Sequence, residues 1–168
     1  MTTNFKPMVF QLKTERLDLS MWEESDSEWL RLLIGERGGE VPTLESTCSR
    51  IIEMRQKAIE NGISLLTIRR RDEGDFIGYC GLIIGRSTLE EPEIAYELFR
   101  SAHGNGYATE AASAIVDAAI ATGRSRLWST VRAWNAASFR VLEKIGFERH
   151  HCTRDENPGE IVWNVRDL

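Results

Sequence analysis

The sequence is poor in the residues on which metal and disulfide sites depend. Among 168 residues it has three histidines and only three cysteines, namely Cys48, Cys80 and Cys152. Cysteines so few and so far apart form neither a disulfide framework nor a paired zinc motif, and the histidines lack HExxH spacing. We therefore expect reduced, structural cysteines and no bound metal.

The sequence also lacks long apolar runs and a basic surplus. No run approaches the roughly 18 apolar residues of a membrane span, and the first ten residues, MTTNFKPMVF, lack the features of a secretory signal. A net charge of -5 is atypical of nucleic-acid-binding domains. We expect a cytoplasmic protein without nucleic-acid or membrane partners. The length and the 42% hydrophobic content fit one domain spanning residues 1–168.

Strand and helix patterns alternate along the chain without repeats. Alternating apolar residues predict a first strand at 17–21, and two helices follow, one after Asp26 and one from Thr43 to Gly62. ISLLTIRR and FIGYCGLIIG predict a hairpin, and PEIAYELF a fourth strand. The rest of the chain predicts a helix from 106 to about 122, a strand in LWSTVR, a helix in NAASFRVLEKIGF, and closing strands at 147–152 and 160–165. This order indicates a mixed α/β (α+β) domain.

The segment SAHGNG lies between the fourth strand and a helix, and it places Gly104 and Gly106 at the helix start. Free backbone N–H groups and the positive end of the helix dipole favour an anion there, and phosphate is the natural ligand. A second interpretation gives the glycines only turn and packing roles. The spacing excludes a Walker loop, which needs GxxxxGK[ST], and Thr109 stands where the dinucleotide fingerprint has its third glycine.

Two longer segments carry a family resemblance. EIAYELFRSAHGNGYATEA and NAASFRVLEKIGF resemble the GNAT family of N-acetyltransferases, especially the RimJ/RimL-like branch that acetylates N-termini of ribosomal proteins. TERLDL and IGYCGL resemble strands of the same branch. The resemblance implies the GNAT fold, with a central, mostly antiparallel, splayed sheet of about six to seven strands and about four helices.

The resemblance implies an acetyl-CoA-dependent N-acetyltransferase that moves an acetyl group directly to a primary amine. The acceptor is a protein N-terminal α-amine or a small-molecule amine. An alternative is an acetyl-CoA-binding sensor or interaction domain without transferase activity. The sequence leaves the identity of the acceptor and the oligomeric state, including a homodimer, open.

The resemblance implies cofactor contacts at three places in the sequence. The pyrophosphate is expected at Gly104–Ala108, and the pantetheine arm along Leu98–Arg100 and at Asn135 and Ser138. The full set implied by the resemblance is Leu98, Phe99, Arg100, Gly104, Asn105, Gly106, Tyr107, Ala108, Thr109, Asn135 and Ser138.

This loop departs from the family pattern at two positions. The family often has cationic or amide side chains where Ser101 and Asn105 stand here. We expect backbone donors to carry more of the phosphate recognition, with Arg100 or His103 as substitute cations. Since a charge-assisted hydrogen bond contributes about 1.5 to 3 kcal/mol, weaker cofactor affinity is expected. Lys144 is a further phosphate candidate, although it also fits a solvated helix charge.

Catalysis requires a base for the amine and a donor for the departing thiolate. Glu93 and Glu97 share one face of a strand, and Glu93 is our expected base. Ser138 is our expected donor. Each has a structural alternative: Glu93 orders a strand or loop, and Ser138 caps its helix. Tyr107 is a further donor candidate, and Glu110 complements the dipole of its helix.

Overall fold

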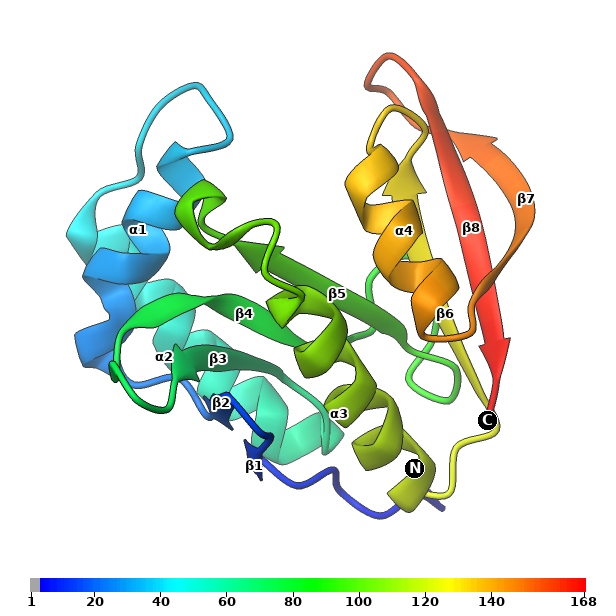
Figure 1. The fold of residues 1–168 in the computed structure, drawn as a ribbon, viewed down its shortest axis with the longest axis horizontal. Coiled ribbons are helices and arrows are strands. Elements are labelled where there is room, and N and C mark those ends of the chain that lie inside the picture. Colours follow the sequence, from blue (N-terminus) through cyan, green and yellow to red (C-terminus); the bar gives the residue numbers. More distant parts are fainter. Residues whose placement is uncertain (1–3) are drawn as a thin grey trace.

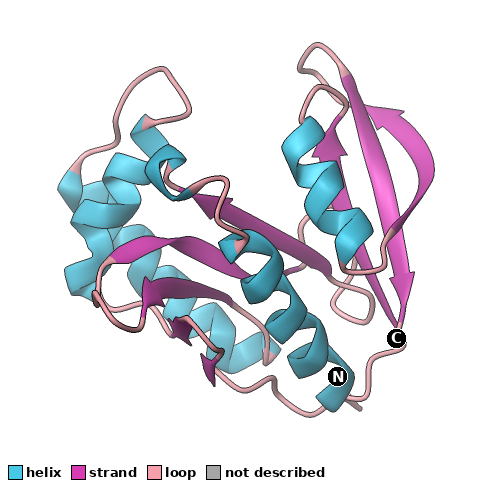
Figure 2. Ribbon diagram, in the orientation of Figure 1, coloured by secondary structure: helices cyan, strands magenta, loops and turns pink. Residues whose placement is uncertain are grey.

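The computed structural model describes residues 4–168, which form one sheet with helices on both faces (Figures 1 and 2). Its helices are α1 (Ser27–Gly35), α2 (Leu44–Asn61), α3 (Tyr107–Ala121) and α4 (Ala136–Lys144), with short 3-10 turns at Glu24–Asp26 (η1) and Arg100–Ala102 (η2). The strands are β1 (Gln11–Lys13), β2 (Leu17–Ser20), β3 (Leu65–Arg70), β4 (Phe76–Ile83), β5 (Glu93–Leu98), β6 (Arg126–Arg132), β7 (Glu148–Arg154) and β8 (Glu160–Asp167).

The sheet order is β1-β2-β3-β4-β5-β6-β8-β7. Every neighbouring pair is antiparallel except β5 and β6, which are parallel and paired at a single position, Glu93 with Trp128. Beyond that pair the two strands diverge, and Figure 1 shows the gap that separates β5 from β6. We call this gap the splay. It leaves the facing edges of two adjacent strands without a ladder between them.

The helices divide between the two faces of the sheet. α1 and α2 lie on one face, and α3 and α4 lie on the other (Figure 1). Under α1 and α2, Trp22, Leu33, Ile51 and Phe76 form one apolar cluster. A larger cluster lies under α3, whose Ala111, Ala112, Ile115 and Ala119 are fully buried. The small side chains of α3 let it pack closely on the sheet, and this fixes the position of its N-terminus.

The predicted fold class is confirmed, with four helices and a mostly antiparallel sheet that is splayed between β5 and β6. The sheet has eight strands, one more than the upper expected count. The additional strand, β1, has only three residues, QLK, and pairs with β2. A strand this short has too few alternations to give a sequence signal. Among residues 4–168, no helix is both long and apolar enough to cross a membrane.

Candidate cofactor and acetyl-transfer site

The two predicted loop glycines both take positive φ angles, +78° for Gly104 and +80° for Gly106. Gly106 is the N-cap of α3, and no side chain caps the helix there. The first intrahelical bond runs from Glu110 N to Gly106 O, so the N–H groups of residues 106–109 have no helical acceptor. A Cβ placed on Gly104 would meet nothing within 4 Å. The loop therefore offers unshielded backbone donors at the positive end of a helix dipole.

Asn105, between the glycines, does not project toward this anion site. Its Nδ2 donates to the carbonyl oxygens of Ala102 (3.2 Å) and His103 (3.1 Å), which folds the side chain back on its own loop. Asn105 therefore stabilises the loop conformation, and its side chain provides no positive charge.

A guanidinium does reach the loop, and it comes from a distant turn that was not among the predicted site residues. Arg16 lies in the turn between β1 and β2. Its NH1 group donates to Asn105 O (2.9 Å), and its carbon Cζ lies 4.5 Å from the centre of the Tyr107 ring. Its Nε donates to Glu110 Oε1 at 2.7 Å. Arg16 thus ties the turn to both ends of the phosphate-type loop.

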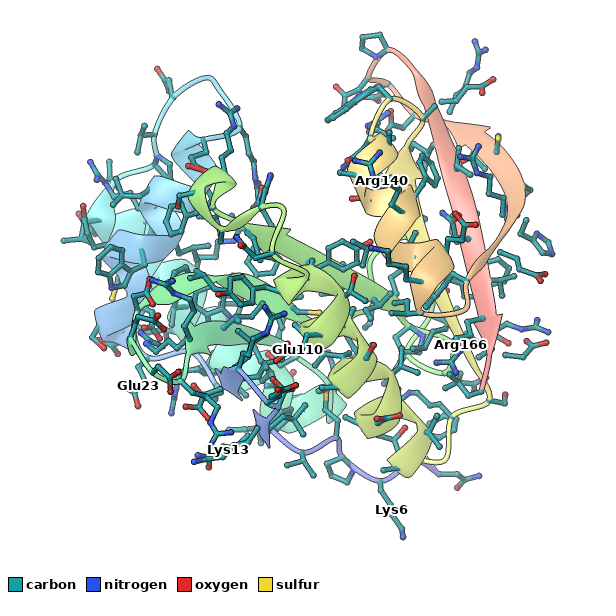
Figure 3. All side chains as sticks on the ribbon, viewed as in Figure 1. Lys6, Lys13, Glu23, Glu110, Arg140 and Arg166 are labelled. Atoms are coloured by element: carbon teal, nitrogen blue, oxygen red, sulfur yellow. The ribbon has the colours of Figure 1, made fainter. Side chains whose placement is uncertain are left out.

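Glu110, labelled in Figure 3, accepts two further hydrogen bonds at the start of α3. Its Oε2 accepts from the Thr14 hydroxyl (2.5 Å) and from the backbone N–H of Arg16 (2.9 Å). Burial raises the pKa of this carboxyl, but the hydrogen bonds from Thr14 and Arg16 outweigh it, and the net pKa is lowered. The predicted dipole-complementing charge is also the anchor of the β1–β2 turn.

The two cations expected to replace the loop's missing charges have other partners. The Arg100 guanidinium donates to Glu36 O (2.8 Å), and its backbone N–H donates to the Glu36 carboxylate. The His103 ring bonds through Nε2 to Leu98 O at 3.0 Å. Because a carbonyl oxygen only accepts, Nε2 carries the proton in this contact. Among the described residues, Arg16 is the guanidinium that bonds to the loop.

The backbone of β5 alternates between its two neighbours. Phe99 N donates to Ile77 O, on the β4 side, so the groups of Leu98 and Tyr96 point to the splay. Ser129 Oγ and the His103 ring already bond to Ile94 O and Leu98 O on this edge. Predicted contacts at Phe99 and Arg100 are less accessible, because Phe99 O accepts from Ala102 N and Arg100 O from His103 N. Tyr96 is the central residue of this edge, and it was not among the predicted site residues.

Residues of α4 lie on the other side of the splay. Asn135 caps α4, with its Oδ1 accepting from Ser138 N at 3.3 Å. The Tyr96 hydroxyl crosses the splay and donates to Ser138 O at 2.9 Å. The Ser138 hydroxyl itself forms no hydrogen bond among residues 4–168, so it does not cap the helix. Burial raises the pKa of Tyr96 well above its ordinary value, which keeps its hydroxyl protonated.

Glu93 is 3% exposed, and its carboxylate is held by donors on both oxygens. Oε1 accepts from Thr130 N (2.9 Å) and the Thr130 hydroxyl (2.5 Å), while Oε2 accepts from Arg86 N (2.5 Å). These bonds join β5 to β6 and to the β4–β5 loop at the closed end of the splay. This geometry favours the ordering role that was the alternative to a catalytic base.

Glu97 lies on the same face as Glu93 but is more accessible, with its side chain 25% exposed. Arg37, from the loop between α1 and α2, binds it in a bidentate manner, with Nε at 2.8 Å and NH2 at 2.6 Å. Burial and the Glu97 charge raise the pKa of the neighbouring Tyr79 to about 12. The two bonds from Arg37 give the Glu97 carboxylate a fixed cationic partner.

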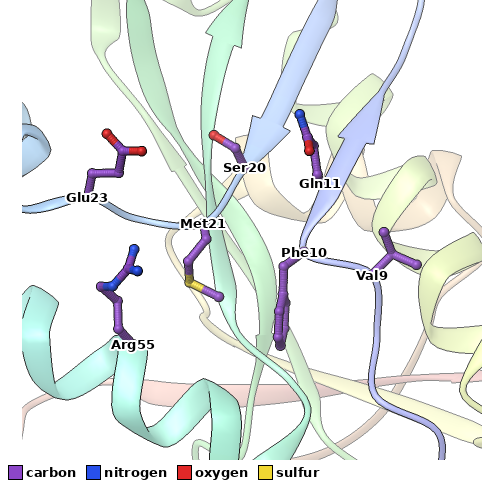
Figure 4. A pocket seen from close by; sticks show the side chains of 7 residues that line it. All are labelled: Val9, Phe10, Gln11, Ser20, Met21, Glu23 and Arg55. Carbon is purple, nitrogen blue, oxygen red and sulfur yellow. The ribbon is translucent and has the colours of Figure 1, made fainter.

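Other features of the surface lie away from this site. A hollow of about 650 Å³ is lined by Val9, Phe10, Gln11, Ser20, Met21, Glu23 and Arg55 (Figure 4). It lies at the opposite end of β2 from Arg16. Within the described part of the chain, no three His, Cys, Asp or Glu side chains gather as a metal site. Burial raises the pKa of the Cys80 thiol, which leaves it protonated and unreactive.

A splayed mixed sheet with an uncapped helix N-terminus beside the gap is an arrangement that could hold an elongated, phosphate-bearing ligand between two strands. Comparison with known proteins identifies the family. The sequence model described as Acetyltransferase (GNAT) domain matches residues 13–148. The chain belongs to the GNAT family of N-acetyltransferases, which confirms the resemblance drawn from the sequence.

Individual proteins give the same result. The chain is 35% identical over 106 residues to the uncharacterized protein YkkB of Bacillus subtilis, a match that covers 61% of this chain and spans 60% of the length of that relative. The crystal structure of an acetyltransferase from Agrobacterium tumefaciens aligns with a TM-score of 0.77, 29% identity and coverage of 93% and 94% of the two chains.

RimL, described as a ribosomal L7/L12 alpha-N-protein acetyltransferase in complex with coenzyme A, aligns with a TM-score of 0.80. It covers 92% of this chain and 96% of its own, at 16% identity. At this identity the similarity is one of fold.

Proposed function

We propose that this protein transfers the acetyl group of acetyl-CoA directly to a primary amine, either a protein N-terminal α-amine or a small-molecule amine. The observation that carries the proposal is the uncapped, glycine-bearing N-terminus of α3 next to the splay. Its donors suit a pyrophosphate, and the coenzyme A complex of RimL supports the choice of cofactor.

The cofactor would bind along the edge of β5. The pyrophosphate would contact the amides of Gly104–Thr109, with Arg16 supporting the loop from behind. The amide groups of the pantetheine arm would pair with the backbone of Tyr96 and Leu98, as an added strand does. Asn135 and Ser138 would face the arm from α4, which brings the thioester toward the closed end of the splay.

The acceptor would then approach from the opposite face of the sheet, where Glu93 and Glu97 lie. Attack requires a neutral amine, and an α-amine, with a pKa of about 7.7 to 8.0, is deprotonated more easily than lysine, with a pKa of about 10.4. The nitrogen attacks the thioester carbonyl, the C–S bond breaks, and the amine proton leaves to a base. An N-acetylated product and CoA result.

Ser138 remains our proposed donor to the departing thiolate, and its free hydroxyl supports the role. Tyr96 is a second donor within reach of the same part of α4, since its hydroxyl bonds to Ser138 O. For the base, Glu93 remains a prediction, but it is 3% exposed and both of its carboxylate oxygens already accept hydrogen bonds from Thr130 and Arg86. Glu97, or a water molecule beside it, has the better access.

The test is thiol release from acetyl-CoA across a panel of N-terminal peptides and small amines. Gly104→Leu should abolish release, because the new side chain would project into the proposed phosphate site. Gly123→Leu is a matched control: Gly123 has a φ of +89° and equally open surroundings, but lies after the C-terminus of α3. Gly123→Leu therefore has the same backbone strain as Gly104→Leu, but it should retain activity.

Tight acetyl-CoA binding without thiol release from any amine would instead favour the sensor alternative. Equal activity of the two glycine variants would refute the assignment of the loop.

A further inference from the structure

Two arginines that the proposed function leaves unassigned share one carboxylate on the acceptor face. Asp155, at the start of the β7–β8 loop, accepts from Arg132 NH1 (3.1 Å) and NH2 (2.7 Å) and from Arg86 NH2 (3.2 Å). Arg132 ends β6, and Arg86 lies in the β4–β5 loop. Three separate segments therefore meet at this one carboxylate.

The cluster adjoins the closed end of the splay. Arg86 NH1 donates to the Thr130 hydroxyl (3.0 Å), and the same hydroxyl donates to Glu93. Since Glu93 and Glu97 face away from α3 and α4, the two guanidiniums lie on the acceptor side of the sheet. The proposed thioester position and the arginine pair are thus on opposite sides of the same strand junction.

The arrangement suits an exchangeable carboxylate. A guanidinium binds a carboxylate through two parallel N–H bonds, and Arg132 does so here. The side chains of Arg86, Arg132 and Asp155 are 44%, 23% and 32% exposed, so solutes can reach them. Asp155 belongs to an exposed hairpin loop, and such loops rearrange at a low free-energy cost. The hydrogen bonds from Arg132 lower the pKa of Asp155 to about 2, so it is ionised at neutral pH.

We propose that Arg86 and Arg132 bind the carboxylate of the acceptor, which displaces Asp155, and that the acceptor is therefore a free amino acid. This inference rests on the proposed function and narrows its acceptor class. In a peptide or protein N-terminus the first residue carries an amide where a free amino acid carries its carboxylate. An amide has one neutral acceptor oxygen, so it cannot accept the two parallel bonds that Arg132 donates to a carboxylate or neutralise the two guanidiniums, and the pair therefore discriminates between the two classes.

The experiment compares kcat/KM for a panel of L-amino acids and for the corresponding C-terminal amides. A neighbouring carboxylate favours the protonated form of an amine, so at neutral pH a larger fraction of the amino acid amide is present as the reactive, neutral amine. A site for carboxylates should reverse this order and favour the acids by about tenfold or more. Preference for amides or N-terminal peptides over every amino acid would overturn the proposal.

Two variants test whether this cluster causes the preference for acids, and a third is a control. Arg132→Gln should lower the acid-to-amide ratio about tenfold. Asp155→Asn should raise it, because the competing internal carboxylate is gone, whereas a purely structural Asp155 would lower activity with all acceptors alike. Arg154→Gln is the control. It removes one positive charge, as Arg132→Gln does, from the residue next to Asp155, and among the described residues Arg154 pairs only with Glu160. It should leave the ratio unchanged.

Binding without chemistry separates this inference from the proposed function. N-acetylglycine carries the carboxylate but no nucleophile, and N-acetylglycinamide is its neutral match. Calorimetry should show that Asp155→Asn binds N-acetylglycine about tenfold more tightly than the wild type does, with no gain for the amide. That result without any acetyl transfer would leave the carboxylate site standing and refute the transferase. Equal affinity for both probes in both proteins would refute the site.

Discussion

Arg16→Gln tests whether a distant turn supports the cofactor loop. The substitution removes the Nε bond to Glu110, the NH1 bond to Asn105 O and the contact with the Tyr107 ring. Arg16 is 43% exposed, so the ion pair contributes about 0.2 to 1 kcal/mol. The charged bond to the carbonyl adds about 1 kcal/mol after solvent screening, and the ring contact about 0.5. Glu110 keeps its bonds from Thr14 and the Arg16 backbone, which limits the loss to about 2 kcal/mol.

For a domain of this size a loss of about 2 kcal/mol lowers Tm by roughly 4 to 8 °C. Because the released loop must be reordered when phosphate binds, the KM for acetyl-CoA should rise about tenfold, which corresponds to about 1.4 kcal/mol. Thermal unfolding and thiol-release kinetics measure the two effects. Arg31→Gln, which breaks only an exposed pair with Glu28 on α1, should change neither by a measurable amount. A wild-type KM in Arg16→Gln would refute the supporting role.

Three further predictions concern single groups. Ser138→Ala should lower kcat about 100-fold at unchanged Tm, since the hydroxyl bonds to no described residue; full turnover would exclude it as the donor. Glu93→Gln should lower the free energy of unfolding by about 2 kcal/mol, because the new amide group points a donor at Thr130 N–H or Arg86 N–H. A changed pH dependence of the rate in the folded variant would instead support Glu93 as the base. Glu110 has a lowered pKa in the folded state, so its stabilising effect is complete above the ordinary carboxyl range and is lost as the pH falls through the folded-state pKa. The wild type should therefore be more stable than Glu110→Gln at neutral pH, and this difference in the free energy of unfolding should shrink as the pH falls; a difference that does not change with pH would contradict this.

Much of the fold follows from local sequence patterns. The apolar alternation of β2 and β5, the long helix α3 and the glycines that end helices act over a few residues, and each predicted element appears in the structure. β1 escapes because a three-residue strand is defined by its partner and not by its own pattern. The splay was expected only through the family resemblance, since nothing in the spacing of residues 93–98 and 126–132 tells whether two strands pair.

The candidate site was less predictable, because its polar contacts join distant segments. The glycine loop could be read from six consecutive residues. Arg16 reaches Glu110 across 94 positions and Arg86 reaches Asp155 across 69, and no local period encodes such pairs. The signal that could have identified Arg16 is the absence of cations in the loop itself, which required a charge from elsewhere. The sequence likewise placed Glu93 and Glu97 on one face but could not show that Arg37 and Thr130 would give them different surroundings.

The splay has a consequence for the solubility of the protein. A strand edge with free N–H and C=O groups normally recruits another strand, and long exposed edges promote aggregation. Here two such edges lie inside the molecule and face each other, and the helices α3 and α4 limit access to them from one side. The fold can therefore keep an open edge for recognition without presenting it to other polypeptides.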